Sequence, residues 1–243
     1  MKTLSLLGFW AGLAALSATG LVGAMENGTG PDPTVQWQVE TLTTRSGDDG
    51  KAATLAVATR AAFSGPPKHV LLVVSTFTKP MLKVGQGSTA LVLNFPWVIA
   101  SARLNAHSIA VALADSPSDA NKRRLVNRHT AEIAGDIDAV LQRLKLRFPG
   151  VPIHLAGFGP EAGRLLEATS GVNDLVRVVI ASGDFRDNRI EDWSSYKRPV
   201  LLIHAPSAQC DIAPFFEAEL VARKNRFVLV QAGYSHPEPK HNC

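Results

Sequence analysis

A series of short, almost wholly apolar runs constrains the fold of this chain more than any other feature of its sequence. The runs are rich in Val, Ile and Leu and show no alternation with polar residues, which is typical of parallel strands buried on both faces of a sheet. Stretches with helical character separate them, so the chain is predicted to form an α/β domain whose mostly parallel central sheet is flanked by helices. The predicted strands are residues 70–75, 108–113, 152–156, 176–182, 200–204 and 227–231.

The segments between these runs contain helix signals. One has apolar residues at helical spacing and ends at Phe148-Pro149-Gly150, which is a helix stop. Another covers residues 211–224, where Pro214 fits the first turn of a helix. The apolar positions of the first segment are Ile133, Ile137, Val140, Leu141 and Leu144.

A different pattern precedes the apolar runs. Val35, Trp37 and Val39 alternate with polar residues, and the alternation resumes after the turn-forming residues 46–50. Two alternating segments around such a turn predict an N-terminal β-hairpin. The second segment has Ala53, Leu55 and Val57 at its alternating positions.

The N-terminal residues are typical of a targeting segment. Lys2 precedes an apolar run over residues 4–21, and the small residues Val22-Gly23-Ala24 follow it. We expect residues 1–24 to be a cleaved signal peptide, with a retained membrane anchor as the alternative. Residues 25–34 are predicted to be a disordered lead-in and residues 35–243 a single domain. The expected location is periplasmic or secreted, without membrane contact after cleavage.

Charge and motifs favour neither nucleic acid nor a bound cofactor. The formal net charge is only +4, and the basic cluster of Lys122, Arg123 and Arg124 has no interleaved aromatic residues. Residues 85–88 are too short for a phosphate-binding loop. His154 and His204 lie in or at apolar strands, and the spacing of the histidines predicts no metal site. We therefore expect no cofactor, and a small molecule or a protein as the unknown partner.

The chain contains two cysteines, Cys210 and Cys243. In an exported protein they are expected to form one disulfide, since the compartment is oxidising. Two free thiols or a metal-binding pair are the alternatives.

The order of several segments resembles the α/β-hydrolase family, including its secreted or periplasmic bacterial members. The similar segments are Asn94-Phe95, 114–119, 152–159 and 200–204, and the resemblance covers roughly residues 68–243. It implies a single-domain α/β-hydrolase-like fold. It also implies that 152–159 enters the turn that presents the nucleophile.

That turn is degenerate in this chain. The family's G-x-S-x-G motif is here Gly157-Phe158-Gly159-Pro160-Glu161, so a glycine occupies the nucleophile position. Pro160 lacks the backbone N–H that would help to bind the oxyanion, although it suits the first position of the next helix. Glu161 replaces the last glycine of the motif. We expect Gly159 to relieve the strain of the turn, because glycine accepts backbone angles that serine does not favour.

The acid and the histidine that the resemblance implies are also hard to assign. Asp211 follows the strand that should precede the acid, but it serves equally as a helix N-cap. His236 and His241 are the candidates for the base. The residues expected to line a pocket at the strand ends are Ser75, Thr76, Phe158, Gly159, Glu161 and His236.

Three functional classes remain open on these grounds. The first is an exported hydrolase-fold protein that has lost serine-hydrolase activity and binds a ligand or a protein. The second is an esterase-like hydrolase that uses a displaced serine, with His236 as its base. The third is a structural or partner-binding module that makes contact through the hairpin and the C-terminal tail. The displaced serine would be Ser75, Ser88 or Ser235.

Overall fold

The computed structural model describes residues 37–46, 51–61, 65–75, 82–84, 90–92, 96–120, 127–181, 193, 195–204 and 215–231. The predicted signal peptide, the lead-in, the basic cluster at 122–124 and both cysteines lie outside these residues. The disulfide and the division of the chain into segments therefore stay predictions. No helix in the described part of the chain is both long and apolar enough to cross a membrane.

The predicted N-terminal hairpin is confirmed. Strands β1 (Gln38–Ser46) and β2 (Ala52–Arg60) pair antiparallel, with Leu42 opposite Leu55. The register shifts between Thr43 and Arg45, which marks a bulge in β1. The side chains of Ala53, Leu55 and Val57 are buried, as the alternation predicts.

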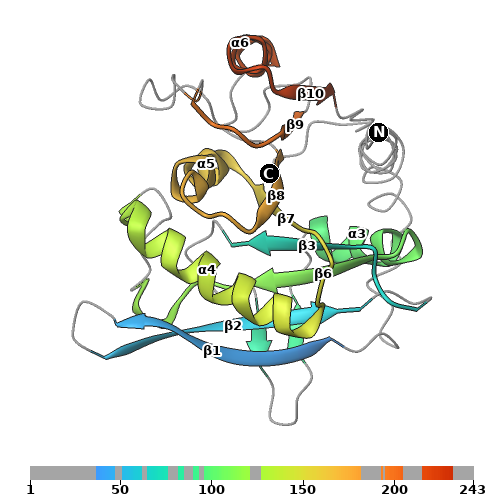
Figure 1. The fold of residues 1–243 in the computed structure, drawn as a ribbon, viewed down its shortest axis with the longest axis vertical. Helices are drawn as coiled ribbons and strands as arrows, with labels where there is room; N and C mark the ends of the chain where they lie inside the picture. The colour runs from blue at the N-terminus through green and yellow to red at the C-terminus, as the bar shows by residue number, and fades with distance from the viewer. Residues whose placement is uncertain are drawn as a thin grey trace, which may run out of the picture.

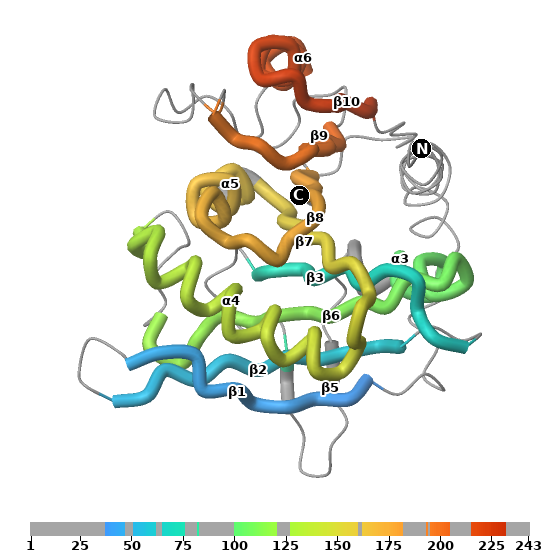
Figure 2. Tube along the Cα trace, in the orientation of Figure 1, coloured from blue at the N-terminus to red at the C-terminus, as the bar shows by residue number. Residues whose placement is uncertain are grey.

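The predicted strands form one eight-stranded sheet (Figures 1 and 2) in the order β1-β2-β6-β3-β7-β8-β9-β10. Strands β6, β3, β7, β8, β9 and β10 pair parallel, and only β1 and β2 run antiparallel to their neighbours. The prediction of a mostly parallel sheet is therefore confirmed. The parallel strands are β3 (His69–Val74), β6 (Ile109–Ala114), β7 (Ile153–Phe158), β8 (Leu175–Ala181), β9 (Val200–His204) and β10 (Val228–Gln231).

Helices cover both faces of this sheet, which explains the continuous apolar runs. Helices α4 (Thr130–Arg147), α5 (Arg164–Thr169) and α6 (Phe215–Asn225) contribute to the core on one face. Helix α3 (Pro96–Ala106) packs on the other face through Ala100 and Leu104. Strands β4 (Leu82–Val84) and β5 (Ala90–Val92) form a separate two-stranded sheet.

The helix signals agree with the structure where it describes them. The five apolar positions of α4 are all buried, and the helix ends before Phe148, with Gly150 at a φ of +76°. Helix α6 begins at Phe215, while residues 205–214 lie outside the described part. The sequence places Pro160 at the first position of the helix that follows β7. The structure has it as the first residue of the 3-10 helix η4 (Pro160–Gly163), which leads into α5.

Candidate functional site

The carboxyl ends of the central strands lie at one edge of the sheet, where open α/β sheets place ligands. Ser75 follows β3, Asp115 follows β6 and Gly159 follows β7. Since Val74 is in register with Ala114, Ser75 and Asp115 are neighbours across β3 and β6, and the Ser75 N–H donates to the Ala114 carbonyl at 2.9 Å. Ser75, Asp115 and Gly159 therefore lie at the same edge of the sheet.

The turn after β7 has a sharp backbone conformation. Gly159 is buried and has a φ of +92°, the left-handed region that favours glycine. Its N–H donates to the Ala181 carbonyl at 2.9 Å, and its carbonyl accepts from the Ala162 N–H at 3.0 Å. This angle agrees with the expectation that the position needs glycine's freedom. The apex of the turn carries no side chain that could act as a nucleophile.

Gly157 has a separate role in packing α5 onto the sheet. A Cβ atom at this position would lie 2.5 Å from Leu165 Cδ1 and 3.0 Å from Ala162 Cβ. Distances this short are repulsive, so a side chain here would push the 3-10 turn and α5 away from β7. The first glycine of the motif therefore has a packing role that does not depend on whether the turn is catalytic.

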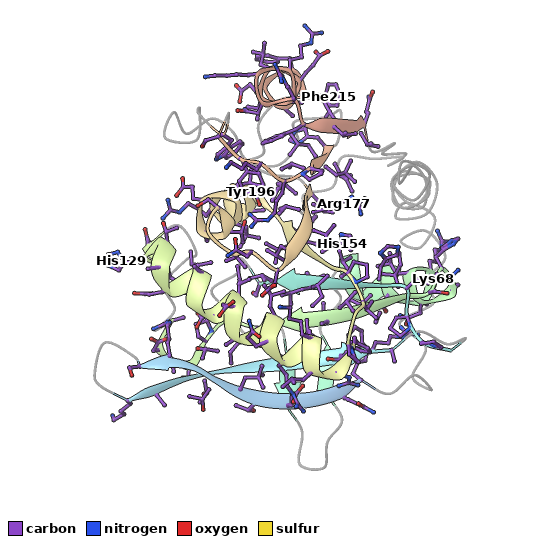
Figure 3. All side chains as sticks on the ribbon, in the orientation of Figure 1. Lys68, His129, His154, Arg177, Tyr196 and Phe215 are labelled. Carbon is purple, nitrogen blue, oxygen red and sulfur yellow. The ribbon has the colours of Figure 1, made fainter. Side chains whose placement is uncertain are left out.

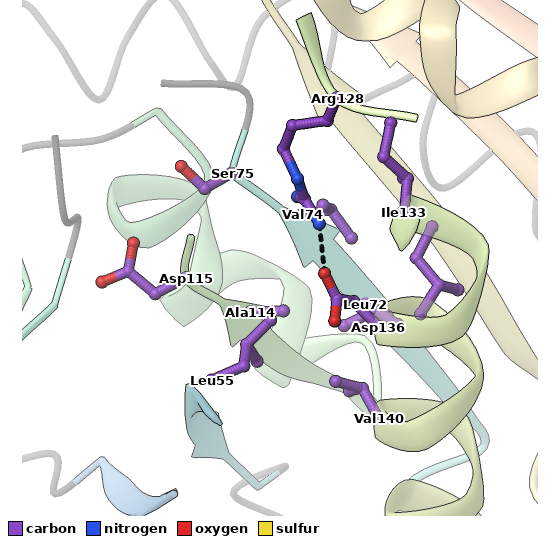
Figure 4. Close-up of a pocket in the computed structure, with 11 residues that line it drawn as sticks. Leu55, Leu72, Val74, Ser75, Ala114, Asp115, Arg128, Ile133, Asp136 and Val140 are labelled. Atoms are coloured by element: carbon purple, nitrogen blue, oxygen red, sulfur yellow. Dashed lines mark hydrogen bonds and ion pairs between the residues drawn. The ribbon is translucent and has the colours of Figure 1, made fainter. Parts of the chain in front are cut away.

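A small cavity lies beside the strand ends, between the sheet and α4 (Figure 4). Its volume is about 10 Å³, which is enough for about one water molecule. Ser75 and Asp115 lie on one side and the Arg128–Asp136 ion pair on the other. The remaining lining residues are Leu55, Leu72, Val74, Ala114, Ile133, Ile137 and Val140.

Each oxygen of the Asp115 carboxylate accepts a hydrogen bond from the backbone. One oxygen accepts from the Leu82 N–H at 2.9 Å, and the other accepts from the Ser116 N–H at 2.8 Å. The first of these bonds ties β4 to the end of β6. Asp115 is buried, and these bonds satisfy both of its oxygens.

A buried ion network closes the cavity on the α4 side. Asp136 pairs with Arg128, and it also accepts from Thr44 Oγ1 at 2.5 Å and from Arg45 Nε at 3.2 Å. Arg45 in turn makes two hydrogen bonds to Asp119, at 2.7 and 2.9 Å. Burial acts to lower the pKa of Arg45, but the hydrogen bond to Asp119 and the surrounding carboxylates outweigh it and raise that pKa. The network holds β1, η2 (Ser118–Ala120) and α4 together.

The histidines of the described strands lie away from this cavity. His69 Nδ1 and His154 Nε2 are 3.1 Å apart, and the buried Arg177 lies near them (Figure 3). Burial, with the charges of His69 and Arg177, lowers the pKa of His154 to about 3. Burial and the charges of Arg177 and Lys68 also lower the pKa of His69. His154 is fully buried in the sheet, and His69 is partly buried beside it.

His204 ends β9, is almost fully buried, and its ring lies 6.3 Å from that of Phe215. The interpretation of His154 and His204 as residues of the sheet is thus consistent with their burial. Among the described residues no histidine lines the cavity, and no three metal-binding side chains gather in one place.

The structure brings together part of the predicted pocket. Ser75 lines the cavity, whereas Phe158 and Gly159 lie at the neighbouring end of β7 and do not line it. Thr76, Asp211, His236, His241, Ser88 and Ser235 lie outside the described residues, as do the side chains of Pro160 and Glu161. Sequence reasoning missed the Arg128–Asp136 pair, which no motif marks, and it included Asp115 in the similar segment 114–119 without assigning it a role.

No protein-family model and no curated protein matches this sequence. Solved structures do resemble it. The α/β serine hydrolase XC6422 from Xanthomonas campestris, described as lacking a lid, is 17% identical with a TM-score of 0.56, over 84% of this chain and 86% of that one.

Two further structures give similar values. Est1E from Butyrivibrio proteoclasticus is 15% identical with a TM-score of 0.54, over 82% of this chain and 92% of that one. A cold-adapted esterase from an Arctic intertidal metagenomic library is 13% identical with a TM-score of 0.56, over 84% and 88%. At such identities the likeness concerns architecture, since one fold hosts many activities. The sheet order and these similarities show that the chain has the α/β-hydrolase fold.

Proposed function

We propose that this protein is an exported α/β-hydrolase-fold protein that has lost serine-hydrolase activity and acts by binding a protein. The observation that carries the proposal is Gly159 at the apex of the turn after β7, with a φ of +92°. The turn has the shape in which the fold presents a nucleophile, and its apex residue has no hydroxyl to present.

The residue after the apex supports the same reading. Pro160 has no backbone N–H, so it cannot supply the oxyanion-hole donor expected at that place in the motif. Loss of one such donor costs about 3 to 4 kcal/mol of transition-state stabilisation in a working enzyme. A Gly159→Ser change alone should therefore not create an esterase.

The cavity favours a protein over a small molecule as the partner. Sites for small molecules usually have volumes of hundreds of Å³. The cavity at the described strand ends has only about 10 Å³, and its two carboxylates are engaged, Asp115 with backbone N–H groups and Asp136 with Arg128. The part of the proposal that concerns export is supported by residues 1–24, which have the composition of a signal peptide.

The second candidate function is hydrolysis through Ser75, favoured by one observation. Ser75 lies beside Asp115 at the end of the central strands, where the fold places its chemistry. Against it, Asp115 is engaged with two backbone N–H groups, and the described residues provide no histidine at the cavity.

Ester turnover separates the two candidates. Hydrolysis of p-nitrophenyl acetate and butyrate would be measured for the wild-type protein, Ser75→Ala and Gly159→Ser, against a heat-denatured sample. We expect all three rates to equal that of the denatured control. Turnover by the wild type that disappears in Ser75→Ala would establish hydrolysis through Ser75 and would contradict the loss of hydrolase activity.

A further inference from the structure

The last helix and the last strand form a surface distinct from the strand ends, here called the α6–β10 edge and comprising Phe215–Gln231. It lies at the end of the sheet opposite β1 (Figure 1). A groove of about 590 Å³ runs between the two elements. It is lined by Phe215, Glu219, Ala222, Arg223, Arg226, Phe227, Leu229 and Gln231.

Strand β10 lies at an edge of the described sheet, and its own sequence has none of the residues that discourage pairing. Within the described residues it has β9 on one side and no strand on the other. Its sequence, Val-Leu-Val-Gln, contains no charged residue and no proline. The opposite edge strand, β1, has Glu40, Arg45 and a bulge, which are devices that block edge pairing. Of the two edges of the eight-stranded sheet that the structure describes, the β10 edge is therefore the better suited to accept another strand.

Apolar side chains extend the surface along α6. Phe216 and Leu220 are one helical turn apart and are 58% and 60% exposed, and Val228 at the start of β10 is 47% exposed. Grouped apolar exposure of this kind marks association sites, whereas single exposed residues need no explanation.

The charges of α6 are arranged so that two copies of the helix, placed antiparallel, would face each other with opposite charges. Glu217 and Glu219 lie in its first half, and Arg223 and Lys224 lie in its last turn. Glu219 and Arg223 form an exposed pair at 2.8 Å on the flank that lines the groove. An antiparallel copy of the same helix would place Arg223 opposite Glu219 and Glu219 opposite Arg223.

We propose that the α6–β10 edge binds a second copy of this chain about a two-fold axis. The two β10 strands pair antiparallel around Leu229, which sets Val228 opposite Val230 and Phe227 opposite Gln231, with no like charges facing each other. The two α6 helices then lie antiparallel on the same face of the extended sheet. Such a contact is self-complementary and closes as a dimer.

This inference does not depend on the loss of catalysis. None of the residues of the α6–β10 edge lines the cavity at the strand ends. The result of the ester-turnover assay therefore does not decide whether the protein dimerises, and the reverse also holds.

A charge-reversal experiment tests the proposal. Sedimentation velocity over a concentration series would be measured for the wild-type protein, Glu219→Arg, Arg223→Glu and the double reversal. We expect a wild-type dimer, and a dissociation constant at least about tenfold weaker for each single variant, because like charges then face each other twice. The double reversal restores opposite charges and should restore the dimer.

Mixing the two single variants separates a contact between copies from one within the helix. A copy with two arginines and a copy with two glutamates complement each other, so the mixture should form a heterodimer that neither variant forms alone. Arg143→Glu, at an exposed pair near the opposite edge, is the matched control and should leave the dimer unchanged.

Two results would overturn the proposal. One is a wild-type protein that stays monomeric throughout the series. The other is a dimer that both single variants retain at wild-type affinity. Val230→Lys gives a second route to the same answer, since a charged residue on β10 should prevent strand pairing.

Discussion

The carboxyl ends of the central strands and the α6–β10 edge differ in how their polar groups are used. At the strand ends, Asp115 and Asp136 are buried and fully engaged, and the cavity between them has the volume of about one water molecule. At the α6–β10 edge, Glu219 and Arg223 are exposed beside a groove of about 590 Å³. Among the described residues, the strand ends, where this fold is expected to place its chemistry, are thus packed as a core, and a lateral edge has the features of a binding surface.

The largest expected effect is the loss of the buried network. Asp136→Ala leaves Arg128 and Arg45 without a shared carboxylate in a buried site, and should lower the free energy of unfolding by about 3 to 5 kcal/mol. Urea unfolding measures it. Asp138→Ala, at an exposed position of the same helix, should change stability by less than about 0.5 kcal/mol. Equal effects for the two variants would mean that the strand ends are not closed as described.

A smaller loss is expected when a side chain is added beneath α5. Gly157→Ala places Cβ against Leu165 and Ala162, and should cost about 1 to 3 kcal/mol. Gly171→Ala is the control, since its added Cβ meets nothing within 4 Å. If Gly157→Ala unfolds at the wild-type urea concentration, α5 does not pack on β7 as closely as the structure has it.

The buried His154 should make the stability of the fold depend on pH. The pKa of His154 is about 3 in the fold against an ordinary 6.5, so the unfolded chain binds more protons between these values. Its contribution to stability is complete above about pH 6.5 and is lost as the pH falls toward 3, by at most about 1.4 kcal/mol per pH unit.

Urea unfolding at pH 7, 6 and 5 tests this dependence. His154→Gln should flatten the slope, and His129→Gln, at an exposed position, should leave it unchanged. A wild-type stability that does not vary over this range would contradict the lowered pKa of His154.

The smallest effect on stability is expected at the open edge. Phe216→Ser should change the free energy of unfolding by less than about 0.5 kcal/mol when it is measured at a concentration where the protein is monomeric. The same variant should weaken association, because it removes exposed apolar area from the α6–β10 edge. A large loss of monomer stability would show that Phe216 belongs to the core.

The strands could be predicted from sequence because a strand buried on both faces needs a continuous apolar run. The turn at Gly159 could be placed because a motif marks it. Helix α3 has a weaker signal, since Ala100 and Leu104 are at helical spacing but the consecutive apolar residues Trp97-Val98-Ile99 obscure a single apolar face.

The ion network and the histidine pair could not be predicted. Arg45, Asp119, Arg128 and Asp136 come from separate segments that only the folded chain brings together. His69 and His154 meet because of the register between β3 and β7, which sequence alone does not specify.

Intact-mass analysis after exposure to a fluorophosphonate tests the central claim most directly, since this probe reports any activated serine regardless of substrate. For the purified protein, beside an active serine esterase as positive control, we expect no adduct. A stoichiometric adduct that is absent from the denatured protein would contradict the account. Its position would then identify the nucleophile, and loss of the adduct in Ser75→Ala would place that nucleophile beside Asp115.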